Sequence, residues 1–550
     1  MALGGLGEIG LNVYLYGLGP EGDRQWLMVD LGVTFPHEAE PGVDVVLPDL
    51  RFIEQDAAAL AGVVLTHAHE DHIGAVIDLW PRLKAPIYAT PFTAGMLRSK
   101  LAEYGGHLKL PITELPLGGR FQVGRFDVEL VTMSHSIPEP SGVAIRTQRG
   151  LVFHTGDWKL DRTPLIGDPT DEEKIRELGN EGVTALVCDS TNAFRDGRSP
   201  SEIEVASSLA KIIKGSKRCV AVTMFASNVA RLRAVADAAK ATGRHLVVVG
   251  RALHRVIQVA IDTGYLPQDF RSLDQTQFGY LQPDEVLALC TGSQGEPRAA
   301  LARISEDEHP DVSLGPGDLV IFSSRTIPGN EKAVTRVLNN LSRLGCEILT
   351  DADALVHVTG HPRREELKQM YAWLRPRVAI PMHGEARHLR EHARLAKAAG
   401  VPEVHTLMDG QMMRIAPGPS AVIDEAPVGR LFRDGRLIVP DDDGPVRERR
   451  RLSFVGLVAV AIVLNRRGGI VGEPEAALDG VPTETARGES MEGLVLDAVE
   501  GTLASIPQAK RRDPALVRDA VKRAVRAAVE RAWGKKPIAK VLITVVDAKG

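Results

Sequence analysis

The segment His67-Ala-His69-Glu-Asp71-His72 places three imidazoles and the Asp71 carboxylate within six residues. It follows the apolar run 61–66, which predicts a buried strand, and precedes the apolar segment 73–80, which predicts the start of a helix. Side chains on a strand-to-helix loop can converge on one point, and neutral imidazole nitrogen and carboxylate oxygen are ligands that Zn²⁺, Mn²⁺ or Fe²⁺ prefer. We therefore predict a metal site, with His67 and His69 facing one ion and Asp71 and His72 facing a second. A histidine-rich polar loop without metal is the alternative, which the strand–loop–helix context disfavours.

The composition is that of an ordinary globular protein with several domains. The chain has 550 residues, of which 44% are hydrophobic and 25% are charged. Its net charge of −5 gives no global positive field, so any binding of nucleic acid must come from local basic patches. The four cysteines are widely spaced and lie in or beside apolar stretches, which predicts buried free thiols in a reducing compartment: Cys188, Cys219, Cys290 and Cys346.

Nothing in the sequence predicts export or a membrane span. The N-terminus has no basic region followed by an apolar core. The longest apolar run, 454–464, is far shorter than the roughly 20 residues needed to cross a bilayer. We therefore expect a cytoplasmic protein without a membrane partner.

The pattern of elements changes along the chain. The N-terminal part alternates strands with glycine-containing turns, and the predicted strands are 11–16, 26–30, 126–131 and 150–154. From about residue 200 helices alternate with strands, with helices predicted at 203–214 and 229–242 and strands at 219–223 and 245–249. Such alternation predicts a parallel sheet with crossover helices.

A charged segment bracketed by prolines, 440–451, is the best candidate for a linker. Beyond it we predict a strand pair around 466–469, helices near 490–505 and at 515–533, and a last strand at 539–546. Val517, Val521, Val525 and Val529 form an apolar stripe on the second helix, whose remaining surface is basic. An amphipathic helix packed on a small sheet is the favoured interpretation, with RNA contact or oligomerisation as the alternative.

Gly5-Leu-Gly-Glu-Ile-Gly10 matches the dinucleotide-binding pattern G-x-G-x-x-G. That pattern requires a preceding strand and a following helix. Only four residues precede it, and an alternating strand follows. A tight loop leading into a strand is therefore predicted in place of a nucleotide site.

Two metal ions need about seven or eight protein ligands and bridges, more than one loop supplies. Asp30, His135, Asp157 and His383 each lie at the end of a strand-like run or just beyond one. Any one of them alone would more often be a structural polar residue. Together they are credible ligands, because residues from separate strand ends can meet along one sheet edge.

The motifs resemble those of a known fold family. His-x-His-x-Asp-His, Ser134-His135 and Thr155-Gly-Asp157 resemble the metallo-β-lactamase fold family, and three further segments resemble its nucleic-acid-processing branch, the β-CASP group: 188–191, 357–361 and 381–385. Within that group the chain is similar to bacterial ribonuclease J over residues 3 to about 435, on the segments 4–10, 225–228, 291–297 and 328–332.

The resemblance implies an α/β fold. A metallo-β-lactamase αββα sandwich would occupy 1–199 and 358–440, with an α/β β-CASP domain inserted at 200–357. A linker at 441–451 would lead to a small C-terminal α/β domain at 452–550.

The resemblance also assigns roles at the metal site. His67, His69 and His135 would hold one ion, Asp71, His72 and His383 the other, with Asp157 bridging them and Asp30 orienting the histidine-rich loop. The expected cofactors are two divalent ions, Zn²⁺ first, with Mn²⁺ or Mg²⁺ as alternatives, which would activate a water for attack on phosphorus. The expected catalytic residues are Asp71, Asp189 and His361; the last two would bind the scissile phosphate and protonate the leaving 3′ oxygen.

A pocket for a 5′-monophosphate is implied as well. The expected substrate-binding residues are Phe225, Ser227, Asn228, Ser293, His357, Thr359, Gly360, His361 and Arg363. The family usually has a small residue and a serine after the Gly-His pair, whereas Pro362 and Arg363 follow here. Pro362 removes an amide donor and Arg363 can supply charge instead. For His357 a histidine satisfied at a strand end is the alternative.

The implied function is that of a dinuclear metal-dependent ribonuclease acting on single-stranded RNA in RNA decay and processing. It would work as a 5′-to-3′ exonuclease, with endonuclease activity open, on 5′-monophosphorylated RNA. A homodimer or homotetramer is expected, and association with a degradosome or ribosome is open. The alternatives are a small-molecule hydrolase such as a lactamase or thioester hydrolase, a DNA-processing β-CASP nuclease, and a non-catalytic RNA-binding scaffold. The long insertion argues against the first, and the complete ligand set against the last.

Overall fold

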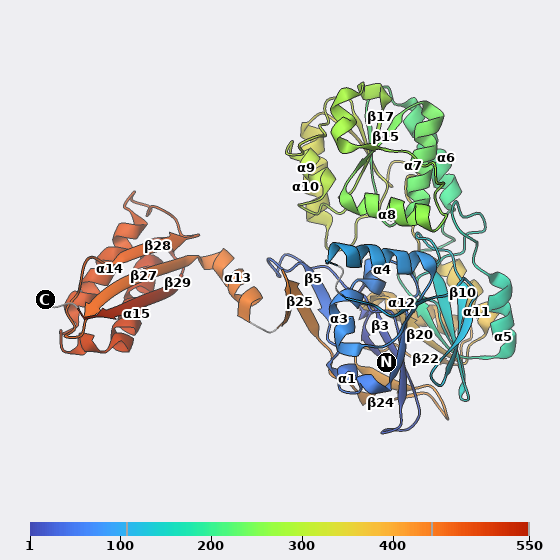
Figure 1. The fold of residues 1–550 in the computed structure, drawn as a ribbon, viewed down its shortest axis with the longest axis horizontal. Helices are drawn as coiled ribbons and strands as arrows, with labels where there is room; N and C mark the ends of the chain where they lie inside the picture. Colours follow the sequence, from blue (N-terminus) through green and yellow to red (C-terminus); the bar gives the residue numbers. More distant parts are fainter. Residues whose placement is uncertain (106–107, 442–443, 548–550) are drawn as a thin grey trace. The chain divides into compact units, whose positions relative to one another are not determined.

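The computed structural model describes residues 1–105, 108–441 and 444–547, and it divides into two compact units (Figure 1). The first comprises Met1–Phe35 and Val45–Leu431, and the second comprises Pro36–Asp44 and Phe432–Gly550. The expected sandwich and its insertion both belong to the first unit.

Two sheets form the centre of the sandwich. The six-stranded sheet has the order β1-β3-β4-β6-β7-β8, and the seven-stranded sheet has the order β22-β20-β13-β12-β11-β10-β9. The strands of the first are Ala2–Gly4, Val13–Leu18, Gln25–Val29, Leu60–Val64, Ile87–Ala89 and Ile112–Glu114. Those of the second are Glu403–Val404, Val378–Met382, Val183–Asp189, Gly150–His154, Ser141–Thr147, Phe126–Thr132 and Arg120–Val123.

Successive side chains of a strand point to opposite faces of the sheet, so one strand can contribute to two hydrophobic cores. In β13, Ala185 and Val187 face the core between the two sheets, while Leu186 and Cys188 face a second core. Three helices cover that second face of the seven-stranded sheet: α5 (Glu172–Glu181), α11 (Arg364–Leu374) and α12 (Ala386–Ala398). The remaining helices of the sandwich are α1 (Arg51–Glu54), α2 (Glu70–Ile73), α3 (Val76–Leu83) and α4 (Pro91–Glu103). The expected αββα sandwich is confirmed.

Shorter strands complete the first unit. They are β2 (Leu6–Gly7), which pairs with β21 (Gly384–Glu385), β23 (Gln411–Arg414), which pairs with β24 (Ala421–Glu425), and β5 (Val45–Pro48). The glycine-rich segment before β3 is thus the predicted tight loop rather than a strand-to-helix turn. Gly5, Gly7 and Gly10 all have positive φ.

The inserted segment is a parallel α/β domain, as its alternating pattern predicts. Its six strands have the order β16-β15-β17-β14-β18-β19, and the strand pairs are parallel. The strands are Leu273–Asp274, His245–Val249, Val286–Cys290, Val220–Thr223, Leu319–Phe322 and Glu347–Leu349. The helices are α6 (Glu202–Gly215), α7 (Val229–Thr242), α8 (Arg251–Asp262), α9 (Ala300–Ser305) and α10 (Glu331–Arg343).

The second unit contains the predicted C-terminal module. Its strand β27 (Leu457–Asn465) pairs antiparallel with β28 (Glu475–Asp479) and parallel with β29 (Ile538–Val546). Helices α14 (Met491–Ser505) and α15 (Pro514–Trp533) share a core with this sheet, and α15 buries there its valine stripe at 517, 521, 525 and 529. Packing on a small sheet, the favoured interpretation of the stripe, is therefore confirmed.

The start of this unit differs from the expected linker. From Gly444 the segment forms helix α13 (Gly444–Val455), and residues 442–443 lie outside the described residues. Pro445 lies in the first turn, where a missing amide costs no intrahelical hydrogen bond. Strands β25 (Arg430–Asp434) and β26 (Leu437–Pro440) precede it. The unit begins at Phe432 and includes Pro36–Asp44, and the Asp44 amide donates to the Arg433 carbonyl.

The cysteines are free thiols, as predicted. Cys188, Cys219 and Cys290 are buried and Cys346 is partly buried. Burial raises the pKa of Cys290 to about 12. Among the described helices, none is long and apolar enough to cross a membrane.

Candidate metal centre

The predicted ligands gather where strands of both sheets end. Asp30 directly follows β4, and His67, His69, Asp71 and His72 follow β6. On the other sheet, His135, Asp157 and His383 follow β10, β12 and β20, in each case at the carboxyl end. Asp71 and His72 lie in the short helix α2, just before the helix that was predicted to start at residue 73.

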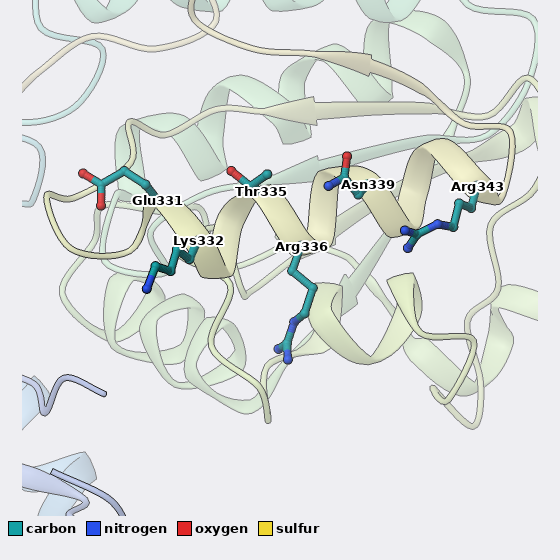
Figure 2. Close-up of a pocket in the computed structure, with 6 residues that line it drawn as sticks. All are labelled: Glu331, Lys332, Thr335, Arg336, Asn339 and Arg343. Atoms are coloured by element: carbon teal, nitrogen blue, oxygen red, sulfur yellow. The ribbon is translucent and has the colours of Figure 1, made fainter. Parts of the chain in front are cut away.

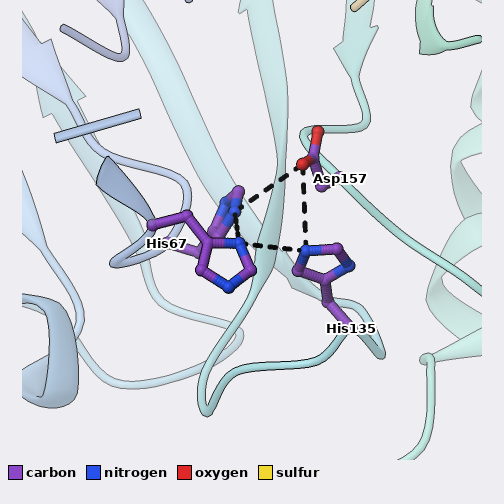
Figure 3. Close-up of side chains that lie close together, drawn as sticks. His67, His135 and Asp157 are labelled. Atoms are coloured by element: carbon purple, nitrogen blue, oxygen red, sulfur yellow. Dashed lines mark hydrogen bonds and ion pairs between the residues drawn. The ribbon is translucent and has the colours of Figure 1, made fainter. Parts of the chain in front are cut away.

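One group consists of His67, His69, His135 and Asp157, whose ligand atoms all lie within 4.8 Å of one another. Nδ1 of His69 is 3.0 Å from Nε2 of His67 and 3.1 Å from Nε2 of His135. Oδ2 of Asp157 is 3.8 Å from each of those two Nε2 atoms. Figure 3 shows His67, His135 and Asp157 directed toward one another.

A second group consists of Asp71, His72, Asp157 and His383, also within 4.8 Å. Oδ2 of Asp157 is 3.3 Å from Nε2 of His72 and 3.4 Å from Nε2 of His383. Nε2 of His72 is 3.5 Å from Oδ2 of Asp71. The same Asp157 oxygen therefore belongs to both groups, as a bridging carboxylate would.

The donor atoms fit a pair of divalent cations. Burial and the neighbouring imidazoles hold the pKa of His67 and of His135 well below its usual range, and burial lowers the pKa of His69 to about 4. Lowered pKa values favour the neutral imidazole, and each neutral ring has one nitrogen lone pair that can bind a cation. Oδ1 of Asp157 is buried without a hydrogen-bond partner among the described residues. Cations between the groups would satisfy atoms that the protein alone leaves unsatisfied.

The second group is more acidic. Burial opposes a charge on His72, but the carboxylates of Asp157, Asp71 and Asp30 outweigh it and raise the pKa of His72 well above its usual range. The negative charge of these three carboxylates around His72 favours binding of a cation.

Four of the ligand imidazoles have a partner on the ring nitrogen that faces away from the site. Nδ1 of His72 is 2.7 Å from Oδ2 of Asp30, which also accepts from Thr66. The corresponding contacts are His67 to Thr66 Oγ1 at 3.0 Å, His135 to the Gly360 carbonyl at 2.6 Å, and His383 to Asn12 Oδ1 at 3.0 Å. Such contacts fix the ring orientation and the tautomer.

Of these partners only Asp30 was predicted as an orienting residue; Thr66 and Asn12 were missed, and Gly360 was expected to contact phosphate. A Cβ at Gly360 would lie 2.4 Å from Cε1 of His135, so only glycine permits this approach. The sequence offered one signal for Asn12, its place directly after the glycine-rich loop.

Asp189 and His361 lie beside the metal ligands. Nδ1 of His361 is 2.7 Å from Oδ2 of Asp189 and 3.9 Å from Oδ2 of Asp157. Burial opposes protonation of His361, but the carboxylates of Asp189 and Asp157 outweigh it and raise its pKa to about 9. The two carboxylates therefore favour the protonated form of His361, next to the cluster.

The residues expected to bind substrate lie at the carboxyl ends of the inserted strands and on the segment that returns to the sandwich. Phe225, Ser227 and Asn228 follow β14, and Ser293 follows β17. Asn228 is buried and its Oδ1 caps α7 by accepting from the Arg231 amide at 2.8 Å.

On the returning segment, Thr359 accepts a hydrogen bond of 2.8 Å from Nδ2 of Asn192. Nδ1 of His357 and Nε of Arg363 are buried without a partner among the described residues. For His357 this argues against the alternative of a fully satisfied histidine. Burial and the positive charges of Arg231 and Arg325 lower the pKa of His357 to about 3.

Two further arginines near Arg363 were missed in the sequence. Burial and the positive charges of Arg325 and Arg363 lower the pKa of Arg195. Arg325 follows β18, and its carbonyl accepts from Nε2 of Gln294 at 2.9 Å, beside Ser293. The three guanidinium groups thus lie close enough to influence one another, and Arg325 also pairs with Asp351 at 3.3 Å.

A separate hollow runs along one face of α10 (Figure 2). It is lined by Glu331, Lys332, Thr335, Arg336, Asn339 and Arg343. Figure 2 shows these side chains on a single helix, and the hollow includes none of the predicted site residues.

Models of four domain families match the chain. They are "Beta-lactamase superfamily domain" at residues 39–189, "Ribonuclease J, beta-CASP domain" at 216–341, "Zn-dependent metallo-hydrolase RNA specificity domain" at 348–407 and "Ribonuclease J C-terminal domain" at 444–546. With the sandwich and the His/Asp cluster, they define a metallo-β-lactamase-fold hydrolase that carries a β-CASP insertion.

Whole-chain relatives narrow the class to one family. Ribonuclease J of Sinorhizobium meliloti is 52% identical over 546 residues, covering 99% of this chain and 97% of the relative. Ribonuclease J of Mycolicibacterium smegmatis is 39% identical with 99% and 96% covered, and that of Thermus thermophilus is 38% identical with 83% and 81% covered. The chain belongs to the ribonuclease J family and is a metal-dependent hydrolase of the ribonuclease class.

Proposed function

We propose that the protein is a dinuclear, Zn²⁺-dependent ribonuclease that degrades 5′-monophosphorylated single-stranded RNA from the 5′ end and also cuts internally. The observation that carries this proposal is the Asp157 oxygen shared by two ligand groups, with His361, whose pKa the neighbouring carboxylates raise, 3.9 Å from it. The physiological setting would be RNA decay and processing in the cytoplasm, in association with a degradosome or ribosome.

In the proposed mechanism the chain's own residues bind the metal ions, orient one another and protonate the leaving group. His67, His69 and His135 would bind one ion, Asp71, His72 and His383 the other, and Asp157 would bridge them. Two such ions lower the pKa of water and stabilise charge on phosphate oxygens. His361 donates its proton to the leaving 3′ oxygen, and Asp189 holds the His361 ring through the 2.7 Å contact to Nδ1.

The 5′-phosphate would bind beside the metal centre. The buried, unpartnered nitrogens of His357 and Arg363 support this, together with the nearby Arg195 and Arg325. Among the described residues the Arg363 Nε–H has no partner, which is costly for a buried donor, and an anion that accepts from it recovers that cost. Arg363 would thus replace the serine that other family members have at this position.

The C-terminal module would support a homodimer or homotetramer. Strand β29 lies at the edge of its three-stranded sheet, and its Leu542 side chain is 64% exposed. An apolar edge strand is a template for pairing with a second copy. Light scattering of Leu542→Lys should show a shift to monomer relative to the unsubstituted chain; an unchanged mass would exclude this edge as the contact.

The function is tested by a substrate panel with and without chelator. The panel contains a 5′-monophosphorylated RNA, the same RNA with a 5′ hydroxyl, the matching DNA, a lactam and a thioester. We expect chelator-sensitive cleavage of the monophosphorylated RNA, with mononucleotides released in order from the 5′ end. Turnover of the lactam or thioester without turnover of RNA would overturn the proposal, and preference for DNA would assign the chain to the DNA-processing alternative.

A further inference from the structure

The glycine-rich segment before β3 contacts three loops of the metal centre. The Gly5 carbonyl accepts from the His383 amide at 3.0 Å. The Asn12 amide donates to the Asp71 carbonyl at 3.1 Å, and the Asn12 carbonyl accepts from the Gly32 amide at 3.0 Å. Residues 5–12 therefore hold together loops that are far apart in the sequence.

The side chain of Asn12 is fully buried and lies among the ligands of the second group. Its Oδ1 is 3.0 Å from Nδ1 of His383 and 3.1 Å from the Tyr14 hydroxyl. Its Nδ2 is 3.0 Å from the Asp71 carbonyl, 3.3 Å from Oδ2 of Asp71 and 3.1 Å from Nε2 of His72. A single amide thus contacts all three ligands that the second group does not share with the first.

These contacts determine which atoms can bind a cation. Nδ1–H of His383 donates to Oδ1, which leaves the lone pair of Nε2 for the ion. The amide N–H donates to Asp71, which fixes the carboxylate without adding a charge. A carboxylate at position 12 would repel Asp71, and an apolar residue would leave both ligands without this partner.

The glycine at position 5 is explained by the same contact. A Cβ at Gly5, whose φ is +97°, would lie 2.7 Å from Oδ1 of Asn12 and 2.5 Å from the Tyr14 hydroxyl. The loop can approach the amide this closely only without a side chain, and glycine tolerates positive φ. The pattern that imitates a dinucleotide motif therefore serves the metal centre.

We propose that Asn12 is the positioning residue for the second ion, setting the tautomer of His383 and the orientation of Asp71. This inference rests on the two-ion site of the proposed function. Among the hydrogen bonds of the described residues, the Asn12 side chain makes none to His67, His69 or His135, so its effect falls on one ion alone.

The test measures metal binding by the full-length protein. Each variant is stripped with chelator, dialysed and titrated with Zn²⁺ by calorimetry, and bound zinc is counted by mass spectrometry. His69→Ala and His383→Ala are references that identify which binding step belongs to which group. Tyr14→Phe is the matched control, because it removes the other hydrogen bond to Oδ1 and leaves the Asn12 amide in place.

For Asn12→Ala we expect the step that His383→Ala removes to weaken about 10- to 100-fold, as loss of an orienting partner typically does. The step that His69→Ala removes should stay within about threefold, and Tyr14→Phe should bind both ions like the unsubstituted chain. Asn12→Leu, which fills the same space without polar atoms, should reproduce the effect. Thermal unfolding separates the roles, since a purely structural defect lowers the zinc-free and zinc-bound midpoints equally.

Unchanged binding of both ions in Asn12→Ala and Asn12→Leu would overturn the inference and leave the two-ion site intact. Equal weakening of both steps, or loss of the folded state in both variants with and without zinc, would also overturn it. If the unsubstituted chain binds fewer than two zinc ions, the dinuclear function itself fails, which is a distinguishable result.

Discussion

The metal centre and the arginine-lined region formed by Arg195, Arg325 and Arg363 differ in how their buried polar atoms are paired. In the metal centre, four ligand imidazoles have a fixed partner on the outward nitrogen, such as Asp30 for His72. In the arginine-lined region, His357 and Arg363 each bury one nitrogen atom that has no partner among the described residues. The protein alone orients the first region, whereas the proposed phosphate would supply the missing partner in the second.

This difference has an energetic meaning. Fixing a ligand ring beforehand reduces the reorganisation needed when the ion binds and when the reaction occurs. A buried donor without a partner costs roughly 1–3 kcal/mol, which an incoming phosphate can offset. We therefore expect substitutions in the metal centre to abolish RNA cleavage. Substitutions in the arginine-lined region should instead change the preference for one RNA 5′ end over another.

The largest effect is expected from His69→Ala. It removes the nitrogen that lies 3.0 and 3.1 Å from the two other imidazoles of the first group. RNA cleavage should fall at least about a thousandfold, more than the 10- to 100-fold typical of losing an orienting partner. Initial rates are compared with those of His254→Ala, an exposed histidine on α8, and circular dichroism checks the fold. Retained cleavage would mean that the first group is not part of the reaction site.

His361→Ala should have the next largest effect. In the proposed mechanism this ring protonates the leaving oxygen, so its loss should slow turnover about 10²- to 10⁴-fold. Single-turnover rates and RNA affinity are measured separately, and affinity should change only a few-fold. Asp189→Asn keeps the shape but loses the ionic contact to His361, and it should show a smaller loss of the same kind. Unchanged turnover in His361→Ala would end the assignment of the proton donor.

The sequence predicted the fold where its periodicity was strong. The helix expected at 229–242 and the strand expected at 245–249 coincide with α7 and β15. Charged, proline-bracketed residues after 440 favoured a linker, and the sequence pattern could not reveal that Pro445 lies in the first turn of helix α13. Proline occurs both in the first turn of helices and in irregular segments. Local sequence preference alone therefore cannot distinguish the two structures.

The site was predictable to the extent that its residue types reveal their chemistry. All seven predicted ligands lie in the two groups, because imidazoles and carboxylates at strand ends are recognisable. The role of Asn12 was not recognisable, because 371 residues separate it from His383 and only the folded chain brings the two together. Arg195 and Arg325 were missed because single arginines in a sequence are usually solvated surface charges.

A more moderate effect is expected from Arg363→Ala, which tests the arginine-lined region. Loss of its charge should reduce the preference for a 5′-monophosphate over a 5′ hydroxyl about tenfold, a typical scale for a charge-assisted hydrogen bond. Cleavage of both RNAs is measured in competition. Arg233→Ala removes an exposed charge from α7 and serves as the control. If the preference persists in Arg363→Ala, the phosphate is bound elsewhere and the contrast between the two regions loses its functional meaning.

The smallest effect on catalysis is expected from Asp409→Asn, which tests how the segment that carries Asn12 is held. Oδ1 of Asp409 accepts from the Leu6 amide at 3.1 Å, and burial raises the pKa of Asp409 to about 7. The unfolded chain releases this proton near pH 4, whereas the folded chain keeps it until about pH 7. Between these values the folded state binds more protons, so its stability falls as the pH rises, by at most about 1.4 kcal/mol per pH unit.

The Asp409→Asn substitution keeps an oxygen acceptor for the Leu6 amide and removes the group that titrates. Chemical denaturation from pH 4 to 8 should therefore show a shallower decline of stability for the variant than for the unsubstituted chain, with RNA cleavage unchanged at neutral pH. An identical pH dependence in both proteins would show that Asp409 does not titrate in this range. The segment before β3 would then be held at the metal centre by its contacts with His383 and Asp71 and not by a protonated carboxyl group.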